Sequence, residues 1–295
     1  MFKSLLSKAL LLLPFVANSA LAEPMVWLAK DSQRQFVLLG SIHVGEQDFY
    51  PLPQVFLDYW PQADGLVVEA NILQPSDVTI DRNIPTNANR LNNQDKDVLA
   101  DIAKEVGLPY QSLIHSPPWL AAINLQMAMA SQAGLDQKQG IDVVLLQRAQ
   151  KQKLPILELE SIKQQLALME NLPDHGEDIL LSTIRDWNKM KSQLSCLISA
   201  WKAGDHQHLL SLFEDSQYSE ITDEKIIFER NRNWAQQLTH KASYQQGTYL
   251  VVVGALHLFG EQGLPALLEK QGFTVKQLTE GQNSECGIQY RGSSI

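Results

Sequence analysis

The 295-residue sequence predicts an α/β fold, with a central mixed β-sheet and helices on both of its faces. Short, continuous apolar runs bounded by turn residues are typical of strands that are buried on both sides of a sheet. Segments with a helical period of about 3.6 residues alternate with these runs, as they do in α/β proteins. The composition agrees, because 44% hydrophobic and 19% charged residues are ordinary values for a globular protein.

The first 22 residues have the organisation of a secretory signal peptide. Lys3 and Lys8 form a positive start, an apolar stretch follows from about residue 9 to residue 16, and Ala-Leu-Ala at 20–22 matches a common cleavage pattern. An uncleaved anchor is the alternative, but a membrane-spanning helix needs roughly 20 apolar residues, more than this run offers. We therefore expect cleavage after Ala22, a periplasmic or secreted protein, and no stable membrane insertion of the mature chain.

The mature chain is acidic and contains both cysteines. Removal of the signal segment takes away two lysines and no acid, which leaves 22 basic and 33 acidic residues and a formal net charge of −11. This balance argues against a nucleic acid partner, because phosphate binding needs clustered lysine and arginine. In an oxidising compartment Cys196 and Cys286 form either a disulfide or two buried free thiols, and the sequence leaves both alternatives open.

Six strands are expected. Four of them are strong, buried apolar runs. The strands nearest the N-terminus and nearest the C-terminus are weaker, and the N-terminal one is expected at an edge of the sheet. In chain order they lie at Met25–Asp31, Phe36–Gly40, Gly65–Ala70, Leu154–Glu160, Thr248–His257 and Phe273–Leu278.

Helices are expected between these strands, and the region from about 95 to 240 should be largely helical and could form a cap. The clearest helices lie at 119–132, 140–152, 206–215 and 222–238. Pro117 and Pro118 suit the start of the first of these, Asp205 should cap the third, and Thr222 should begin the fourth. The polar piece at 74–93 should be a surface loop. Since no linker divides the chain, residues 23–295 are expected to form one domain.

Two segments of the sequence are built alike. “VLLGSIHVGE” and “VVVGALHLFGE” share an aliphatic run, a glycine, and a histidine three residues later, which are His43 and His257. In open α/β sheets, ligands bind outside the carboxyl ends of the strands, where both histidines are predicted to lie. Gly40 and Gly254 would permit close backbone approach there.

Glutamates end the other two strong strands, at Glu69 and at Glu158 with Glu160. A carboxylate at the end of an apolar strand costs several kcal/mol to desolvate unless it is paired or bound to a metal. Two histidines and one or two glutamates would suit a divalent ion such as Zn²⁺, Mn²⁺ or Co²⁺, which could activate water for hydrolysis. Taken singly, each residue could instead be a structural strand-end residue with a backbone partner. Together they favour a site.

Several motifs resemble the TraB/PrgY/GumN family, which includes the Tiki metalloproteases. These are the paired “GSIH” and “GALH”, “VVEA” after the first, “ERNRNW” before the second, and the middle segments “GIDVVLLQRA” and “PILELESIKQQL”. The resemblance extends from about Val26 to Leu278. It implies a fold related to erythromycin esterase and ChaN-like proteins, with the two histidines in a shared central cleft.

The resemblance also implies roles for individual residues. His43 and His257 match the metal or catalytic histidines of the family, and Glu69 matches its carboxylate. Two residues match a polar pair that the family presents to the cleft: Arg230 and Asn231. Glu160 keeps a position of the middle motif, although Ser161 and Lys163 stand where the family has acidic residues.

We therefore expect a metal-dependent hydrolase that acts on a peptide or small-molecule substrate, with peptide bonds as the first choice. Three side chains should hold the ion: His43, Glu69 and His257. The two histidines should face each other across one cleft, with Glu69 within coordination reach of both. Glu160 would bind metal or act as general base, and Arg230 with Asn231 would position the substrate. The alternatives are a metal-free, esterase-like hydrolase in which a histidine activates water, and a non-catalytic protein that binds haem or a peptide.

Overall fold

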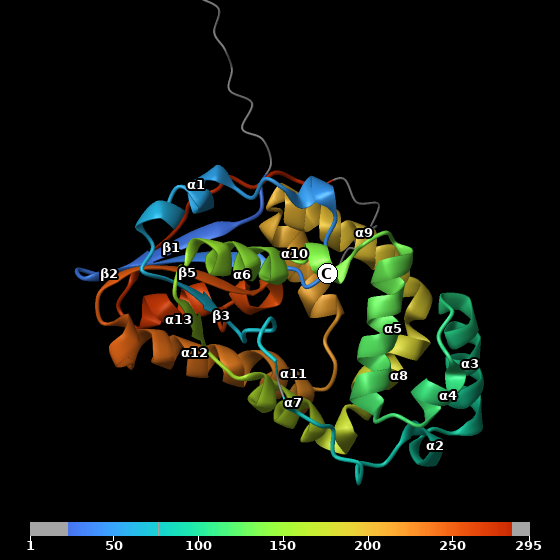
Figure 1. Ribbon diagram of the computed structural model, residues 1–295. Coiled ribbons are helices and arrows are strands. Elements are labelled where there is room, and N and C mark those ends of the chain that lie inside the picture. Colours follow the sequence, from blue (N-terminus) through green and yellow to red (C-terminus); the bar gives the residue numbers. More distant parts are fainter. Residues whose placement is uncertain (1–22, 76, 285–295) are drawn as a thin grey trace, which may run out of the picture.

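The computed structural model describes residues 23–75 and 77–284, and a six-stranded sheet of order β4-β3-β5-β2-β1-β6 forms its centre (Figure 1). Strands β2, β3, β4 and β5 are parallel, whereas β1 is antiparallel to both of its neighbours. The strands are β1 (Val26–Lys30), β2 (Arg34–Ser41), β3 (Gly65–Val68), β4 (Ile156–Glu158), β5 (Gly247–Gly254) and β6 (Thr274–Gln277). The mixed sheet confirms the predicted α/β class. The predicted signal peptide and Cys286 lie outside the described residues.

All six predicted strands are present, but three details differ from the expectation. The first strand is not an edge strand, because the chain returns after the last helix and places β6 beside it. Strand β4 ends at Glu158, since Ser161 and Gln164 form a reciprocal capping box that turns the chain into a helix. Strand β5 ends at Gly254, and His257 lies in the short 3₁₀ helix that follows.

Thirteen α-helices surround the sheet within the described residues. In chain order they are α1 (Gln54–Leu57), α2 (Asn87–Arg90), α3 (Asn93–Val106), α4 (Tyr110–Ile114), α5 (Pro118–Gln132), α6 (Ile141–Gln152), α7 (Ile162–Glu170), α8 (Glu177–Arg185), α9 (Trp187–Ala203), α10 (His206–Asp215), α11 (Glu220–Asp223), α12 (Glu229–His240) and α13 (Leu264–Lys270). A π-helix, Glu224–Phe228, joins α11 to α12. The predicted start at Thr222 is wrong, because Ser219 accepts the backbone N–H of Thr222 and caps α11 instead.

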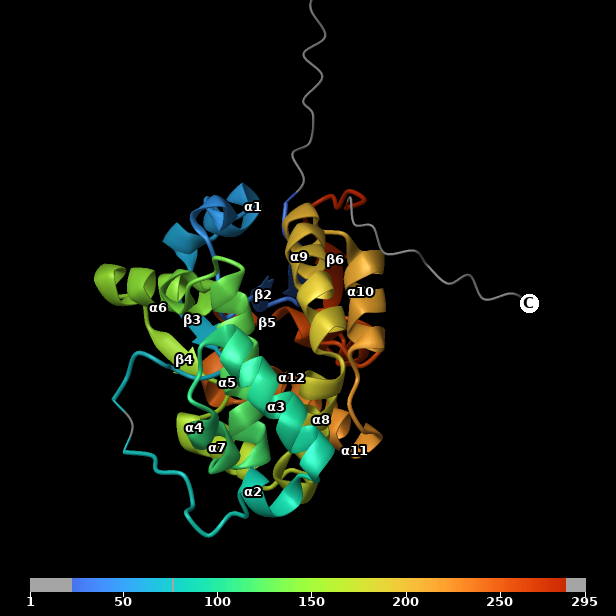
Figure 2. The ribbon, with the colours of Figure 1, turned by 90° about the vertical axis from the view of Figure 1, so that its right-hand side faces the viewer.

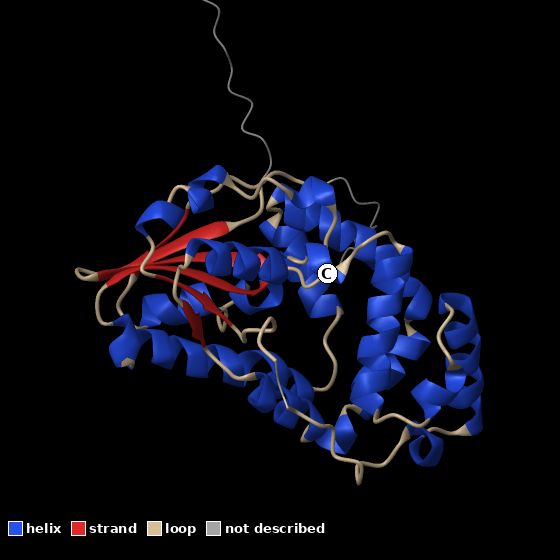
Figure 3. Cartoon of the chain, in the orientation of Figure 1, coloured by secondary structure: helices blue, strands red, loops and turns tan. Residues whose placement is uncertain are grey.

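The side chains of each strand alternate between two cores, one on each face of the sheet. On β2, Val37 and Leu39 face a core that includes α1, α6, α9 and α10, while Phe36 and Leu38 face a core with α12 and α13. Figure 3 shows helices on both sides of the strands. Cys196 is buried in the first core.

A third core lies away from the sheet faces and joins α3, α4, α5 and α8. In Figure 2, where the right side of Figure 1 faces the viewer, these helices lie in front of the sheet. The loop after β2 pairs with the segment after α5 through Gly45 and Asp136. The helical region therefore adjoins the carboxyl ends of the parallel strands. None of the helices in the described residues is both long and apolar enough to cross a membrane.

Candidate functional site

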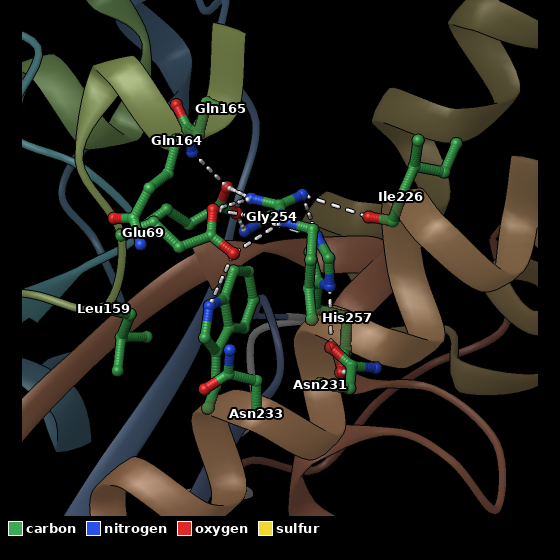
Figure 4. Close-up of polar contacts among 12 residues, drawn as sticks. Glu69, Leu159, Gln164, Gln165, Ile226, Asn231, Asn233, Gly254 and His257 are labelled. Atoms are coloured by element: carbon green, nitrogen blue, oxygen red, sulfur yellow. Dashed lines mark hydrogen bonds and ion pairs between the residues drawn. The ribbon is translucent and has the colours of Figure 1, made fainter. Parts of the chain in front are cut away.

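The predicted site residues follow the carboxyl ends of the parallel strands. His43 follows β2, Glu69 follows β3, Glu160 follows β4 and His257 follows β5. Because these strands are adjacent and parallel, their carboxyl ends meet at one edge of the sheet. Helix α12, which packs against one face, carries the remaining predicted pair, Arg230 and Asn231. Arg230 reaches Glu69 at this edge, and Figure 4 shows Asn231 beside His257.

Arg230 binds two of the predicted glutamates. Its Nη2 donates to Glu69 Oε2 at 2.6 Å and to Glu160 Oε2 at 3.0 Å, and its Nε donates to Glu160 Oε1 at 3.0 Å. The side chains are 13%, 10% and 12% exposed, so the ion pairs are largely desolvated. Burial alone would lower the pKa of Arg230, but the two carboxylates raise it and keep the guanidinium charged.

The helix around Arg230 explains how it reaches the glutamates. Its Nη1 donates to the carbonyl of Ile226 at 3.1 Å, inside the π-helix, a geometry that is frequent at functional sites. One turn later, the fully buried Trp234 lies with its ring 4.6 Å from Arg230 Cζ, and its indole N–H donates to Glu160 Oε1 at 2.9 Å. The indole therefore supports both members of the ion pair.

Glu69 is an ionised carboxylate whose two oxygens both have partners. Oε1 accepts the backbone N–H of Gly254 at 2.7 Å, and Oε2 accepts Gln165 Nε2 at 3.3 Å in addition to Arg230. A Cβ atom at position 254 would lie 3.3 Å from Glu69 Oε1, so glycine permits this close approach. Burial would raise the pKa of Glu69, but the charge of His257 when that ring is protonated, together with the charge of Arg230, outweighs it and lowers the pKa to about 2.

His257 is a buried, neutral histidine. Its Nδ1 lies 2.7 Å from Asn231 Oδ1 and its Nε2 lies 3.2 Å from Arg230 Nη1. Because the arginine can only donate, the hydrogen bonds assign the proton of the ring to Nδ1. Burial lowers the pKa of His257 to about 3, with a contribution from the charge of Arg230.

Arg230 and Asn231 have no donor left for a substrate in this arrangement. The five N–H groups of the guanidinium go to Glu69, Glu160, Ile226 and His257. Both amide hydrogens of Asn231 go to backbone carbonyls, those of His257 and Gln262. The pair therefore positions neighbouring side chains.

His43 pairs with Asp142, a residue for which sequence reasoning assigned no role. His43 Nδ1 lies 2.8 Å from Asp142 Oδ2, and Asp142 Oδ1 accepts the hydroxyl of Ser41 at 2.8 Å. The charge of Asp142 raises the pKa of His43 to about 9, although burial opposes this shift. The net effect favours the protonated ring, while 63% of the side chain remains exposed to solvent. Nε2 is left for solvent or substrate.

The backbone holds the His43 loop against the start of α6. Ile141 N donates to the carbonyl of Ile42 at 3.0 Å, and a Cβ atom on Gly140 would lie 2.4 Å from the carbonyl oxygen of His43. Only glycine permits this contact without movement of the loop. Asp142 lies in the first turn of α6, where a carboxylate is favourable. The sequence signal for it was an acidic residue directly after Gly-Ile at a helix start, within “GIDVVLLQRA”.

Five of the six predicted residues form one hydrogen-bonded cluster: Glu69, Glu160, Arg230, Asn231 and His257. His43 is linked to it by charge, because Glu69 raises and Arg230 lowers the pKa of His43. Glu158 is apart from the cluster and accepts the backbone N–H of Asn71. A pocket of about 620 Å³ along α9, lined by Leu194 and Ile198 among others, contains none of the six.

The donor atoms as they lie do not fit a divalent metal ion. Both oxygens of Glu69 are bonded, His257 Nε2 accepts from Arg230, and the guanidinium cation stands among the expected ligands. Within residues 23–75 and 77–284, no group of three or more His, Cys, Asp or Glu side chains is arranged to hold a metal ion. Ligation by His43, Glu69 and His257 would require Arg230 to move.

Comparison with known proteins gives consistent matches. The model of the TraB/PrgY/gumN family matches residues 25–277. The chain is 33% identical over 252 residues to the protein YbaP of Escherichia coli (strain K12), covering 83% of this chain and 92% of that protein, and YbaP of Shigella flexneri matches equally. A protein of Treponema pallidum (strain Nichols) is 23% identical over 272 residues, covering 84% of this chain and 81% of its own length. No solved structure matches.

Proposed function

The chain belongs to the TraB/PrgY/gumN family, and we propose that it is a hydrolase in which His43, oriented by Asp142, transfers the proton during cleavage of a peptide bond. One observation carries this proposal. Of the six predicted site residues, His43 alone has a largely exposed side chain, at 63%, and its Nδ1 is held 2.8 Å from a carboxylate. A histidine oriented in this way is a common arrangement for proton transfer.

At neutral pH the ring of His43 is protonated and the ring of His257 is neutral, and this difference supports the assignment. The pKa of His43 is raised to about 9, whereas that of His257 is lowered to about 3. Environments that separate the pKa values of neighbouring groups in this way indicate different roles in acid–base chemistry. His43 exchanges protons in the cleft, and His257 serves as a neutral acceptor for Arg230.

The proposed reaction uses water as the nucleophile. Neutral His43 takes a proton from water through Nε2 as the water attacks the peptide carbonyl, and Nδ1–H stays bonded to Asp142. The imidazolium then gives the proton to the leaving amine, which restores the neutral ring. Because only the neutral ring can act as the base, kcat/KM should rise with pH up to about 9. In this reaction the cluster around Arg230 keeps the neighbouring side chains in position and binds no reacting atom.

A metal-dependent hydrolase is the second candidate. Glu69 Oε1 and His257 Nε2 are 3.8 Å apart, so small movements would let both contact one ion if Arg230 withdrew. His43, Glu69 and His257 would then hold Zn²⁺, Mn²⁺ or Co²⁺, which supplies an activated water when it is bound.

A peptide-library cleavage assay with and without exhaustive chelation tests the proposal. We expect cleavage that survives chelation, falls about 10²- to 10⁴-fold in His43→Gln, and is unchanged in the control His240→Gln, which alters an exposed histidine at the end of α12. Loss of cleavage on chelation, with recovery on adding Zn²⁺, Mn²⁺ or Co²⁺, would select the metal-dependent form. Failure to cleave any peptide would contradict both, and haem and peptide binding would then be measured.

We also propose that the protein is exported, with removal of residues 1–22. The support is the charge, apolar run and cleavage pattern of that segment. The mass of the mature protein purified from cells tests this, since retention of residues 1–22 would contradict it.

A further inference from the structure

A serine hydroxyl at the end of strand β2 holds the carboxylate that orients His43. Ser41 Oγ donates to Asp142 Oδ1 at 2.8 Å, and the other oxygen of this carboxylate, Oδ2, lies 2.8 Å from His43 Nδ1. Ser41 is 3% exposed and Asp142 is 8% exposed, so water competes little for the hydrogen bond between them. One buried carboxylate therefore links the hydroxyl to the histidine ring.

The hydroxyl decides which way the carboxylate faces. Within residues 23–75 and 77–284, no other hydrogen bond to Asp142 Oδ1 is found. Asp142 lies in the first turn of α6, and the first N–H groups of a helix have no partner inside it. Without the hydroxyl, the carboxylate could turn toward these N–H groups or toward solvent and leave the ring.

Ser41 is held in place by the sheet. It is the last residue of β2 and is paired with β5. The carbonyl of the preceding Gly40 accepts the indole N–H of Trp201 at 2.9 Å. His43, in contrast, lies in the loop beyond the strand. Because side chains on strands are placed more precisely than side chains on loops, Ser41 can fix Asp142 relative to the sheet.

The second histidine motif lacks this hydroxyl. Ala255 stands where the first motif has Ser41. The partner of His257 is also different, since its Nδ1 lies 2.7 Å from the neutral amide oxygen of Asn231. The hydroxyl thus accompanies the histidine that is paired with a carboxylate, and it is missing beside the one that the proposed reaction does not use for proton transfer.

We propose that Ser41 is a positioning residue, which holds Asp142 against Nδ1 of His43 and so leaves Nε2 of the neutral ring to accept a proton from water. This inference rests on the proposed function for its effect on the reaction, but the hydrogen bond acts on the ring whether or not a substrate is cleaved. The ring nitrogen that keeps the proton is set by the hydrogen bond that the ring makes. A loosened Asp142 would let the proton move to Nε2, where the ring could not act as the base.

NMR of the ring nitrogens in the purified protein measures this tautomer. At about pH 10 the ring of His43 is largely neutral, because its pKa is about 9, and the signals lost in His43→Gln assign it. We expect the Nδ1–H form to dominate in the unmodified protein, and its ratio to the Nε2–H form to fall about 10-fold in Ser41→Ala. Ser41→Thr keeps a hydroxyl and suits a strand, so it should keep the ratio.

The matched control is Ser116→Ala. It removes another buried serine hydroxyl, which donates to a backbone carbonyl at 2.9 Å, and it should leave the ratio unchanged. Ser41→Ala should fold, because alanine occupies the matching position of the second motif.

Peptide cleavage at the same pH gives a second readout. In Ser41→Ala, kcat should fall about 10-fold because the ring is less well oriented, whereas KM should not change because Ser41 is buried. Ser41→Thr should retain the kcat of the unmodified protein.

A tautomer ratio that is unchanged in Ser41→Ala, or that falls equally in Ser41→Ala and Ser41→Thr, would overturn the role of Ser41. A ratio that falls in Ser41→Ala alone, together with no cleavage of any peptide by the unmodified protein, would refute the proposed hydrolase and leave the positioning role standing. Cleavage by the unmodified protein, with an unchanged ratio in Ser41→Ala, would do the reverse.

Discussion

Replacing Arg230 with methionine should destabilise the protein strongly, because it removes the cation that Glu69 and Glu160 share. Both carboxylates are about nine-tenths buried, and their hydrogen bonds to Arg230 are 2.6 to 3.2 Å long. Breaking a buried ion pair by removing one partner costs about 3–5 kcal/mol, since the remaining charge is left without compensation. For a chain of this size we expect the midpoint of thermal unfolding to fall by roughly 6 to 20 °C.

Urea unfolding at pH 7, followed by far-UV circular dichroism, measures this loss. Arg232→Met is the matched control, because Arg232 also pairs with a glutamate, Glu224, but their side chains are 42% and 44% exposed, and its loss should cost less than about 1 kcal/mol. The double variant Arg230→Met with Glu69→Gln should recover part of the stability, since it removes one of the two stranded charges. If Arg230→Met costs no more than Arg232→Met, the buried ion-pair cluster does not exist as described.

Three further predictions concern the groups around this cluster. The native state holds His257 neutral with a pKa of about 3, below its ordinary value of 6.5, so the unfolded chain binds more protons and stability should fall as the pH drops from about 6.5 toward 3; His257→Gln should make urea midpoints depend less on pH in this range. Trp234→Phe keeps the ring but leaves a buried oxygen of Glu160 without its indole donor, so urea unfolding should show a loss of about 1–3 kcal/mol. Gly140→Ala should reduce peptide cleavage far more than it reduces unfolding temperature, because the added Cβ would lie 2.4 Å from the carbonyl of His43 and displace that loop; an unchanged rate would contradict the tight packing.

The strands could be predicted because their signal is local. A continuous apolar run such as “FVLLG” indicates a strand that is buried on both faces. This can be recognised without knowing which strands lie beside it. The place of β1 could not be predicted, because its second neighbour, β6, is supplied by a segment nearly 250 residues later in the chain. The start of α11 was missed for another reason. Ser219 and Thr222 both carry a hydroxyl that could cap a helix. Ser219 is the cap because Thr222 is fully buried, and burial of this kind cannot be read from the local sequence.

The site was predictable to the extent that its residues lie at strand ends. His43, Glu69 and His257 were identified in this way, whereas Arg230, which lies on a helix, was identified only through the family resemblance. Asp142 was missed because its partner, His43, is 99 residues away and the two meet only when α6 packs against the loop after β2. The expectation that Glu69 coordinates together with both histidines stays a prediction, although the bonds of Arg230 now occupy the atoms that it needs.

The central claim is that Asp142 makes His43 the proton-transferring group of the cleft, and an NMR titration of the histidine rings tests it without any substrate. In the unmodified protein we predict one ring with a pKa of about 9, which disappears in His43→Gln. In Asp142→Asn the charge that raises the pKa of His43 is gone while the burial that lowers it remains, so this pKa should fall to 6.5 or below. A His43 ring that titrates near 6.5 in both proteins would contradict the account.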